Sequence, residues 1–166
     1  GMHDTSAAFY FHMNFFNSQN TIYLSTGTTF IFGKYLKKIS SINENSKFYY
    51  LLTNDFQGAI LSRRFHGGLI YDKFKNKNKK KVDYYLASRT IKELDTFKKY
   101  ILDNKINLVI DGHFTKNSKF IQNIKKYKKN ITIYCAKNKY TPSLGMAYLS
   151  ATKKINLSLK DYYYKV

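Results

Sequence analysis

The sequence contains one cysteine, one proline and no tryptophan among its 166 residues. A single thiol, Cys135, cannot form an internal disulfide, so the chain is not a disulfide-stapled secreted scaffold and suits a reducing compartment. Apolar runs of the ~18 residues that a membrane span needs are missing, and so is the basic start and apolar centre of a signal peptide. We therefore expect a cytoplasmic protein with no membrane partner.

Acidic residues are also scarce. Ten Asp and Glu stand against 29 Lys and Arg, which gives a formal net charge of +19 and favours nucleic acid or another anionic partner. However, the excess is nearly all lysine, is spread along the chain and accompanies many Asn, Ile and Tyr, as coding from AT-rich codons also produces. The charge alone therefore indicates no particular partner.

The length and the apolar content predict one α/β domain over residues 1–166, with Gly1, which precedes Met2, as an expression-tag remnant. Helices are expected over 5–16, 29–42, 56–65, 90–104 and 118–129, and strands over 21–25, 47–55, 66–74, 82–88, 106–114 and 130–136. Six lysines between Lys73 and Lys81 indicate a solvated loop. Several of these strands are apolar throughout, which favours a mostly parallel sheet with helices on both faces.

The stretch "STGTT" at residues 25–29 lies between an expected strand and an expected helix. Ser and Thr are common N-caps and Gly permits a tight turn, so the stretch could be an ordinary joint. Alternatively it holds a phosphate or carboxylate, because the first turn of a helix presents unpaired N–H groups. Ligands of such folds bind at the carboxyl ends of the strands, where "STGTT", "TND", "SRT", "DGH" and "AKNKYT" follow.

The order of these motifs resembles the effector-sensing domain of the DeoR family of bacterial transcriptional regulators. The matching strings are "NTIYLSTGTT", "LLTND", "GG", "VIDGH" and "ITIYCAKNKYT", and together they cover roughly residues 5–161. The resemblance implies a fold shared with ribose-5-phosphate isomerase and CoA transferases, with a sugar phosphate bound at the strand ends. It also implies which residues bind that ligand, namely Gly27, Thr28, Thr29, Thr53, Asn54, Gly67, Gly68, Asp111, Gly112 and Lys139. The hydroxyl-rich loop itself adds Ser25 and Thr26 to these candidates.

Membership of that family would make the chain a sensor and not an enzyme. A phosphorylated sugar would shift the population of its conformations, and a homo-oligomer would pass the shift to DNA-binding heads. Such proteins contact DNA through a helix-turn-helix, for which only about 20 residues before the first strand leave no room. We therefore expect a sensing domain without its own DNA-binding domain, a cofactor or a metal.

Two other functions stay open from the residues alone. A sugar-phosphate isomerase would need a carboxylate beside a cation, for which Asp111 and Lys139 are the available pair. A nucleic-acid-binding protein could use the lysines at 73–81 and the basic helix at 118–129 against a phosphate backbone. The four histidines, His3, His12, His66 and His113, are too dispersed for a metal-binding motif, although His66 and His113 adjoin the expected ligand loops.

Overall fold

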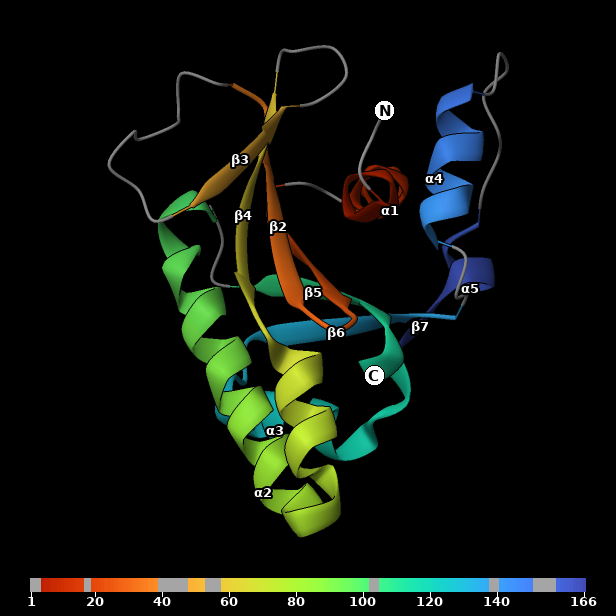
Figure 1. The fold of residues 1–166 in the computed structure, drawn as a ribbon. Coiled ribbons are helices and arrows are strands. Elements are labelled where there is room, and N and C mark those ends of the chain that lie inside the picture. The colour runs from red at the N-terminus through yellow and green to blue at the C-terminus, as the bar shows by residue number, and fades with distance from the viewer. Residues whose placement is uncertain are drawn as a thin grey trace.

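The computed structural model describes residues 4–16, 19–38, 48–52, 58–101, 105–137, 141–150 and 158–166. A seven-stranded sheet lies between two layers of helices, with α2 and α3 on one face and α1 and α4 on the other (Figure 1). The expected single α/β domain with helices on both sides of the sheet is confirmed.

The sheet is mixed, with a parallel core. Its strands are β1 (Thr21–Thr26), β2 (Phe30–Leu36), β3 (Tyr49–Leu52), β4 (Ala59–Phe65), β5 (Ile106–Gly112), β6 (Ile131–Ala136) and β7 (Tyr163–Lys165), in the order β3-β4-β2-β1-β5-β6-β7. β1, β5 and β6 pair in parallel, whereas β2, β3, β4 and β7 join by antiparallel pairing. The expected parallel sheet is therefore its centre, and antiparallel strands extend it on both sides, β2, β4 and β3 beside β1 and β7 beside β6.

The central strands are buried on both faces because alternate side chains enter two separate cores. On β1, Ile22 and Leu24 pack beneath α2 and α3, while Tyr23 packs with Phe9 of α1. Val109 on β5 faces the same side as Tyr23, opposite to its two neighbours in the chain. This two-sided burial explains why these strands read as continuous apolar runs in the sequence.

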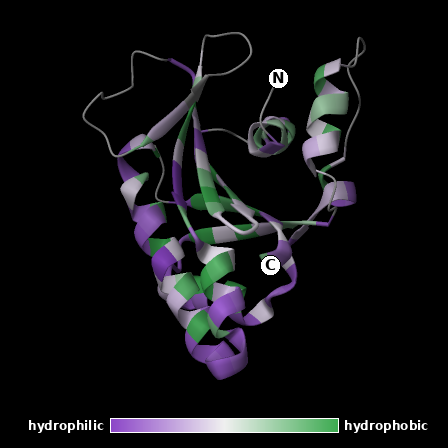
Figure 2. Cartoon of the chain, in the orientation of Figure 1, coloured by the Kyte–Doolittle hydropathy of each residue, from purple (hydrophilic) through white to green (hydrophobic). Residues whose placement is uncertain are grey.

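Helix α2 (Gly67–Thr96) is a helical hairpin with two arms. Asn78 has non-helical backbone angles (φ −159°, ψ 81°), and its side-chain Oδ1 accepts a hydrogen bond from the backbone N–H of Lys81 at 3.1 Å. Asn78 therefore caps the start of a second arm (79–96), which runs back along the first arm (67–77) in Figure 1. Hydrophilic residues crowd the turn between the arms (Figure 2).

The remaining helices hold the edges of the fold. They are α1 (Asp4–Met13), α3 (Ser118–Tyr127), α4 (Thr141–Ser150) and α5 (Leu159–Tyr162), with short 3-10 turns η2 (Lys98–Tyr100) and η3 (His113–Lys116). α1 and α4 pack closely, since a Cβ on Gly145 would lie 2.0 Å from the carbonyl oxygen of Ala7. Among the helices described, none combines the length and the apolarity needed to cross a membrane.

Several local expectations are wrong. Within the described residues, strands β2 and β4 stand where helices were expected over 29–42 and 56–65, and the two strands pair along seven residues each. Residues 39–42 and 56–57 of those ranges lie outside the described residues. The strands expected over 66–74 and 82–88, and the lysine-rich loop between them, all belong to α2. The helix expected at β2 is wrong because tertiary pairing outweighs local propensity there: Phe30 and Phe32 alternate toward the core with the period of a strand. The other expected helices and strands coincide with or overlap observed ones.

Candidate functional site

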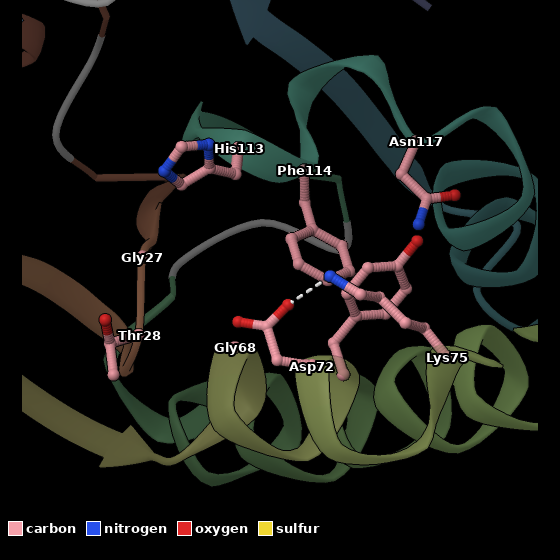
Figure 3. Close-up of a pocket in the computed structure, with 9 residues that line it drawn as sticks. Gly27, Thr28, Gly68, Asp72, Lys75, His113, Phe114 and Asn117 are labelled. Atoms are coloured by element: carbon pink, nitrogen blue, oxygen red, sulfur yellow. Dashed lines mark hydrogen bonds and ion pairs between the residues drawn. The ribbon is translucent and has the colours of Figure 1, made fainter. Parts of the chain in front are cut away.

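A pocket of about 340 Å³ opens where the β1–β2 hairpin, the start of α2 and η3 meet (Figure 3). The residues that line it come from these three elements and from the cap of α3: Gly27, Thr28, Gly68, Tyr71, Asp72, Lys75, His113, Phe114 and Asn117. Two of the expected ligand loops, "STGTT" and "DGH", therefore converge on one cavity.

Strand direction explains this convergence. β1 and β5 are parallel, and β4 runs in the same direction as β1 because both are antiparallel to β2. The carboxyl ends of β1, β4 and β5 therefore lie at the same edge of the sheet, where ligands of α/β folds commonly bind. The "TND" motif follows β3, whose last residue Leu52 pairs with Ala59 at the opposite end of β4. The third expected loop, "SRT", lies inside α2.

The hairpin and α2 are in direct backbone contact. A Cβ on Gly68 would lie 2.2 Å from the carbonyl oxygen of Gly27, and a Cβ on Gly67 would lie 2.5 Å from the Phe30 ring. The backbone N–H of Leu69 also donates to the carbonyl oxygen of Thr28 at 3.2 Å. The two glycines are thus required by packing, and they bring the start of α2 up to the hairpin tip.

Gly27 differs from these two glycines. A Cβ there would have only the carbonyl oxygen of Thr29 within reach, at 4.0 Å, and the backbone does not have the positive φ found at Gly112. Neither packing nor backbone conformation within the described chain therefore requires a glycine at this position. Its missing side chain leaves the hairpin backbone accessible to a group bound in the pocket.

The pocket wall on α2 carries a cation and a carboxylate. The Lys75 Nζ lies 2.7 Å from Asp72 Oδ1, and this hydrogen bond raises the pKa of Lys75, so the ammonium stays charged (Figure 3). The positive end of the α2 dipole lies beside Gly68. His113 and Phe114 line the pocket from η3, opposite the helix (Figure 3).

Thr26 fixes the far wall of the pocket. Its Oγ1 donates to the carbonyl oxygen of Asp111 at 2.5 Å and accepts from the backbone N–H of Phe114 at 3.0 Å. Gly112 has φ 91°, and a Cβ on it would lie 2.5 Å from the carbonyl oxygen of Thr26. The turn into η3 therefore needs glycine at this position, and Thr26 locks that turn against β1.

The Asp111 carboxylate is not among the groups that line the pocket. Its Oδ1 accepts from the backbone N–H of Gly112 at 2.7 Å and from Thr141 Oγ1 at 3.2 Å, and its Oδ2 lies 3.5 Å from His12 Nε2. His12 Nδ1 in turn lies 2.5 Å from the Tyr163 hydroxyl. Burial, followed by the charge of Asp111, raises the pKa of Tyr163. This buried cluster joins α1, α4 and β7 to the end of β5.

The residues expected at the site therefore fall into three groups. Gly27, Thr28 and Gly68 line the pocket, whereas Ser25, Thr26, Thr29, Gly67, Asp111 and Gly112 support its walls or lie beside it. Thr53, Asn54 and Lys139 lie outside the described residues. The expected joint between a strand and a helix at "STGTT" is instead a hairpin between two strands, and Thr29 Oγ1 lies 3.3 Å from His66 Nδ1 at the cap of α2.

Apart from Gly68, sequence reasoning missed the residues that α2 and the cap of α3 contribute to the pocket. Asp72 and Lys75 stand three residues apart, a spacing that makes neighbours only on a helix. Asn117 precedes a predicted helix and caps it by accepting from the backbone N–H of Phe120 at 3.1 Å, while its amide donates to Asp83 Oδ1 at 2.7 Å. Recognising 66–77 as helical would have pointed to the α2 residues.

Comparison with known proteins gives structural likenesses only. No model of a known protein family matches the chain, and no curated protein matches it either. Among solved structures, a carbohydrate kinase from Novosphingobium aromaticivorans matches with a TM-score of 0.67 and 16% identity, over 90% of this chain and 44% of the kinase. A ligand-bound xylulose kinase from Lactobacillus acidophilus matches with a TM-score of 0.66 and 11% identity, over 87% of this chain and 40% of that kinase.

The chain thus spans less than half the length of either kinase. At these identities the likeness establishes the fold alone. Neither structure is described as a transcriptional regulator, and the resemblance to DeoR sensor domains stays a prediction. The chain has the α/β fold found in part of each of these two carbohydrate kinases.

Proposed function

We propose that this chain binds the phosphate groups of a phosphorylated ligand in the hairpin pocket, as the phosphate-handling part of a carbohydrate kinase. The observation that carries the proposal is the convergence of an open glycine hairpin, a helix start and the Lys75 ammonium on one cavity of about 340 Å³. Backbone N–H groups and a nearby cation are the groups with which proteins hold phosphate.

The chemistry of phosphoryl transfer suits such a pocket. Moving a phosphoryl group requires mainly that its charged oxygens be positioned and electrostatically stabilised. The hairpin backbone at Gly27 and Thr28 would position the phosphate chain of the phosphoryl donor, and Lys75 would offset its charge. Asp72 would keep Lys75 directed along the pocket wall, because the two side chains form a hydrogen bond. The remainder of such a kinase would supply the sugar.

A sensor of sugar phosphates, as in the DeoR resemblance, would use the same pocket for a different ligand. The two functions differ in which molecule carries the phosphate. A phosphoryl donor presents a chain of phosphates, whereas an effector sugar presents one phosphate attached to a polyhydroxylated body. Binding measurements with both kinds of ligand therefore distinguish the two functions.

The test is calorimetric titration of the chain with inorganic tripolyphosphate, ATP, a panel of sugar phosphates and the same sugars without phosphate. We expect tripolyphosphate and ATP to bind and unphosphorylated sugars not to bind. A ligand at about 100 times its dissociation constant should also stabilise the fold by roughly 2.7 kcal/mol. Binding of sugar phosphates without tripolyphosphate or ATP would favour the sensor, and no binding of any phosphorylated compound would contradict both functions.

Variants of the lining residues test whether the phosphates bind in the hairpin pocket. Gly27→Val should abolish binding, because its side chain would enter the open space beside the hairpin. Thr28→Val and Lys75→Gln should each weaken binding by about tenfold or more, since a hydrogen bond to a charged group is worth about 1.5–3 kcal/mol. Lys79→Gln is the matched control, because Lys79 does not line the pocket. An equal loss in Lys75→Gln and Lys79→Gln would mean that only general charge attracts the phosphates.

A further inference from the structure

A second cavity, of about 380 Å³, lies between the two arms of α2. Its lining residues are Ile70, Phe74 and Lys77 from the first arm, Asn78 from the turn, and Lys81, Val82 and Tyr85 from the second arm. The first arm thus turns one side to this cavity and another side, with Tyr71, Asp72 and Lys75, to the hairpin pocket. The two cavities share no lining residue, and the proposed phosphate site leaves this one without a role.

The walls of this second cavity, between the two arms of α2, are apolar and accessible. Val82 is buried at 7% exposure, whereas the residues Phe74 and Tyr85 are 39% and 51% exposed. An isolated exposed ring is ordinary on a protein surface, but two rings and two aliphatic side chains around one concavity form an apolar site. Its volume falls within the roughly 300–1,000 Å³ that small-molecule sites occupy.

The rim of the same cavity is positively charged. Lys77 and Lys81 line it from opposite sides of the turn, and within the residues described neither forms an ion pair. The nearest carboxylate along the first arm, Asp72, is hydrogen bonded to Lys75. The cavity therefore combines an apolar interior with two ammonium groups that lack a carboxylate partner.

We propose that this cavity binds a small amphipathic anion, a free molecule with an apolar chain or ring and one carboxylate. The apolar part would cover Phe74 and Tyr85 and contact Val82 at the base. The carboxylate would lie at the turn, between the ammonium groups of Lys77 and Lys81. A neutral apolar molecule would leave those two charges unused, and a small inorganic anion would leave the apolar walls exposed, so neither matches the whole cavity.

Decanoate, kept below its micellar concentration, is the probe for this proposal. We expect saturable binding of one decanoate per chain in calorimetric titration, with a negative heat-capacity change from burial of apolar surface. Decanol should bind at least about tenfold more weakly, because it lacks the charge, and hexanoate should also bind more weakly. Tripolyphosphate should not displace decanoate, since the two cavities are separate.

Paired variants on the same turn separate a site from a diffuse charge effect. The double variant Lys77→Gln/Lys81→Gln should weaken decanoate binding by about tenfold or more, and so should Phe74→Ala. Lys79→Gln/Lys80→Gln removes the same number of charges from the same turn but none from the lining, so its affinity should stay within about twofold of the wild type. Circular dichroism of each variant verifies that α2 remains folded.

Four results would overturn the proposal. Equal losses in the two double variants would mean nonspecific charge attraction. Displacement of decanoate by tripolyphosphate would place it in the hairpin pocket. Binding to anionic phospholipid vesicles without binding to monomeric decanoate would make the turn a membrane contact, and full affinity in a folded Phe74→Ala variant would remove the cavity from the binding surface.

Discussion

The buried Lys34 ammonium donates a hydrogen bond to the backbone carbonyl oxygen of Gln19 at 2.8 Å. Lys34 lies on β2 with 1% of its surface exposed, and burial lowers its pKa from 10.5 to about 8. At pH 7 the folded protein therefore holds a charged ammonium away from water, while the unfolded chain keeps it hydrated. Because of this difference, the stability of the fold should vary with pH in the alkaline range.

We predict that stability rises as pH increases from about 8 to 10.5, because the unfolded chain then binds more protons than the folded one at this site. Lys34→Met removes the buried charge and should accordingly raise the free energy of unfolding at pH 7. The loss of the hydrogen bond to Gln19 should reduce that gain by about 1 kcal/mol. Its advantage over the wild type should shrink toward pH 10. Urea unfolding at several pH values measures this difference, with the exposed Lys37→Met as control. An effect of Lys34→Met that is constant with pH would contradict the prediction.

Thr26→Val tests the link between β1 and η3. Valine has nearly the same shape as threonine but removes two buried hydrogen bonds, one to the carbonyl oxygen of Asp111 and one from the backbone N–H of Phe114. We expect a loss of about 1–3 kcal/mol in the free energy of unfolding, measured with urea. Thr26→Ser, which keeps the hydroxyl, should lose less. A loss in Thr26→Ser as large as that in Thr26→Val would contradict this order, and would show that the methyl group, which valine keeps, contributes as much as the two hydrogen bonds.

Gly68→Ala and Gly27→Ala should have opposite effects on folding and binding. At Gly68 the added methyl group would collide with the hairpin backbone, so we expect destabilisation of about 1–3 kcal/mol, measured by thermal unfolding. At Gly27 the methyl group meets open space, and the melting temperature should stay nearly unchanged while tripolyphosphate binding falls. Unchanged tripolyphosphate affinity in Gly27→Ala would show that the phosphates do not approach the hairpin there.

Duplex DNA should bind this chain weakly and without sequence preference. Scattered lysines release counterions from the phosphate backbone but provide no contacts that read base edges. Filter binding at increasing salt concentration should therefore show that the affinity for duplex DNA falls steeply between low and physiological ionic strength. Tight binding to one sequence at 0.15 M salt would instead support the nucleic-acid-binding alternative.

The sequence predicted the centre of the fold better than its surroundings. β1, β5 and β6 are apolar runs bounded by polar turns, so their type could be predicted from local pattern. The identity of β2 depends on its partners β1 and β4, which are set by tertiary pairing and not by local propensity. In α2 the buried side chains Val82, Leu86 and Leu94 recur at helical spacing, but the exposed Tyr84, Tyr85 and Lys92 between them obscure the pattern.

The same division holds for the candidate site. Loops that follow central strands, containing Gly27 and Gly112, could be placed together because parallel strands end at one edge. The contribution of Asp72 and Lys75 could not, because it depends on recognising a helix in a lysine-rich segment. The non-helical backbone at Asn78 divides one long segment into two arms, and the second cavity lies between them.

The two hydrogen bonds of Thr26 span 85 and 88 residues of sequence. Contacts between such distant residues close large loops, which costs chain entropy and slows folding. The hairpin of β1 and β2 can form locally and early, but η3 reaches its place beside the hairpin only after β5 has docked along β1. In a refolding experiment, we therefore expect the capacity to bind tripolyphosphate to recover with the slowest refolding phase, well after helical circular dichroism has returned.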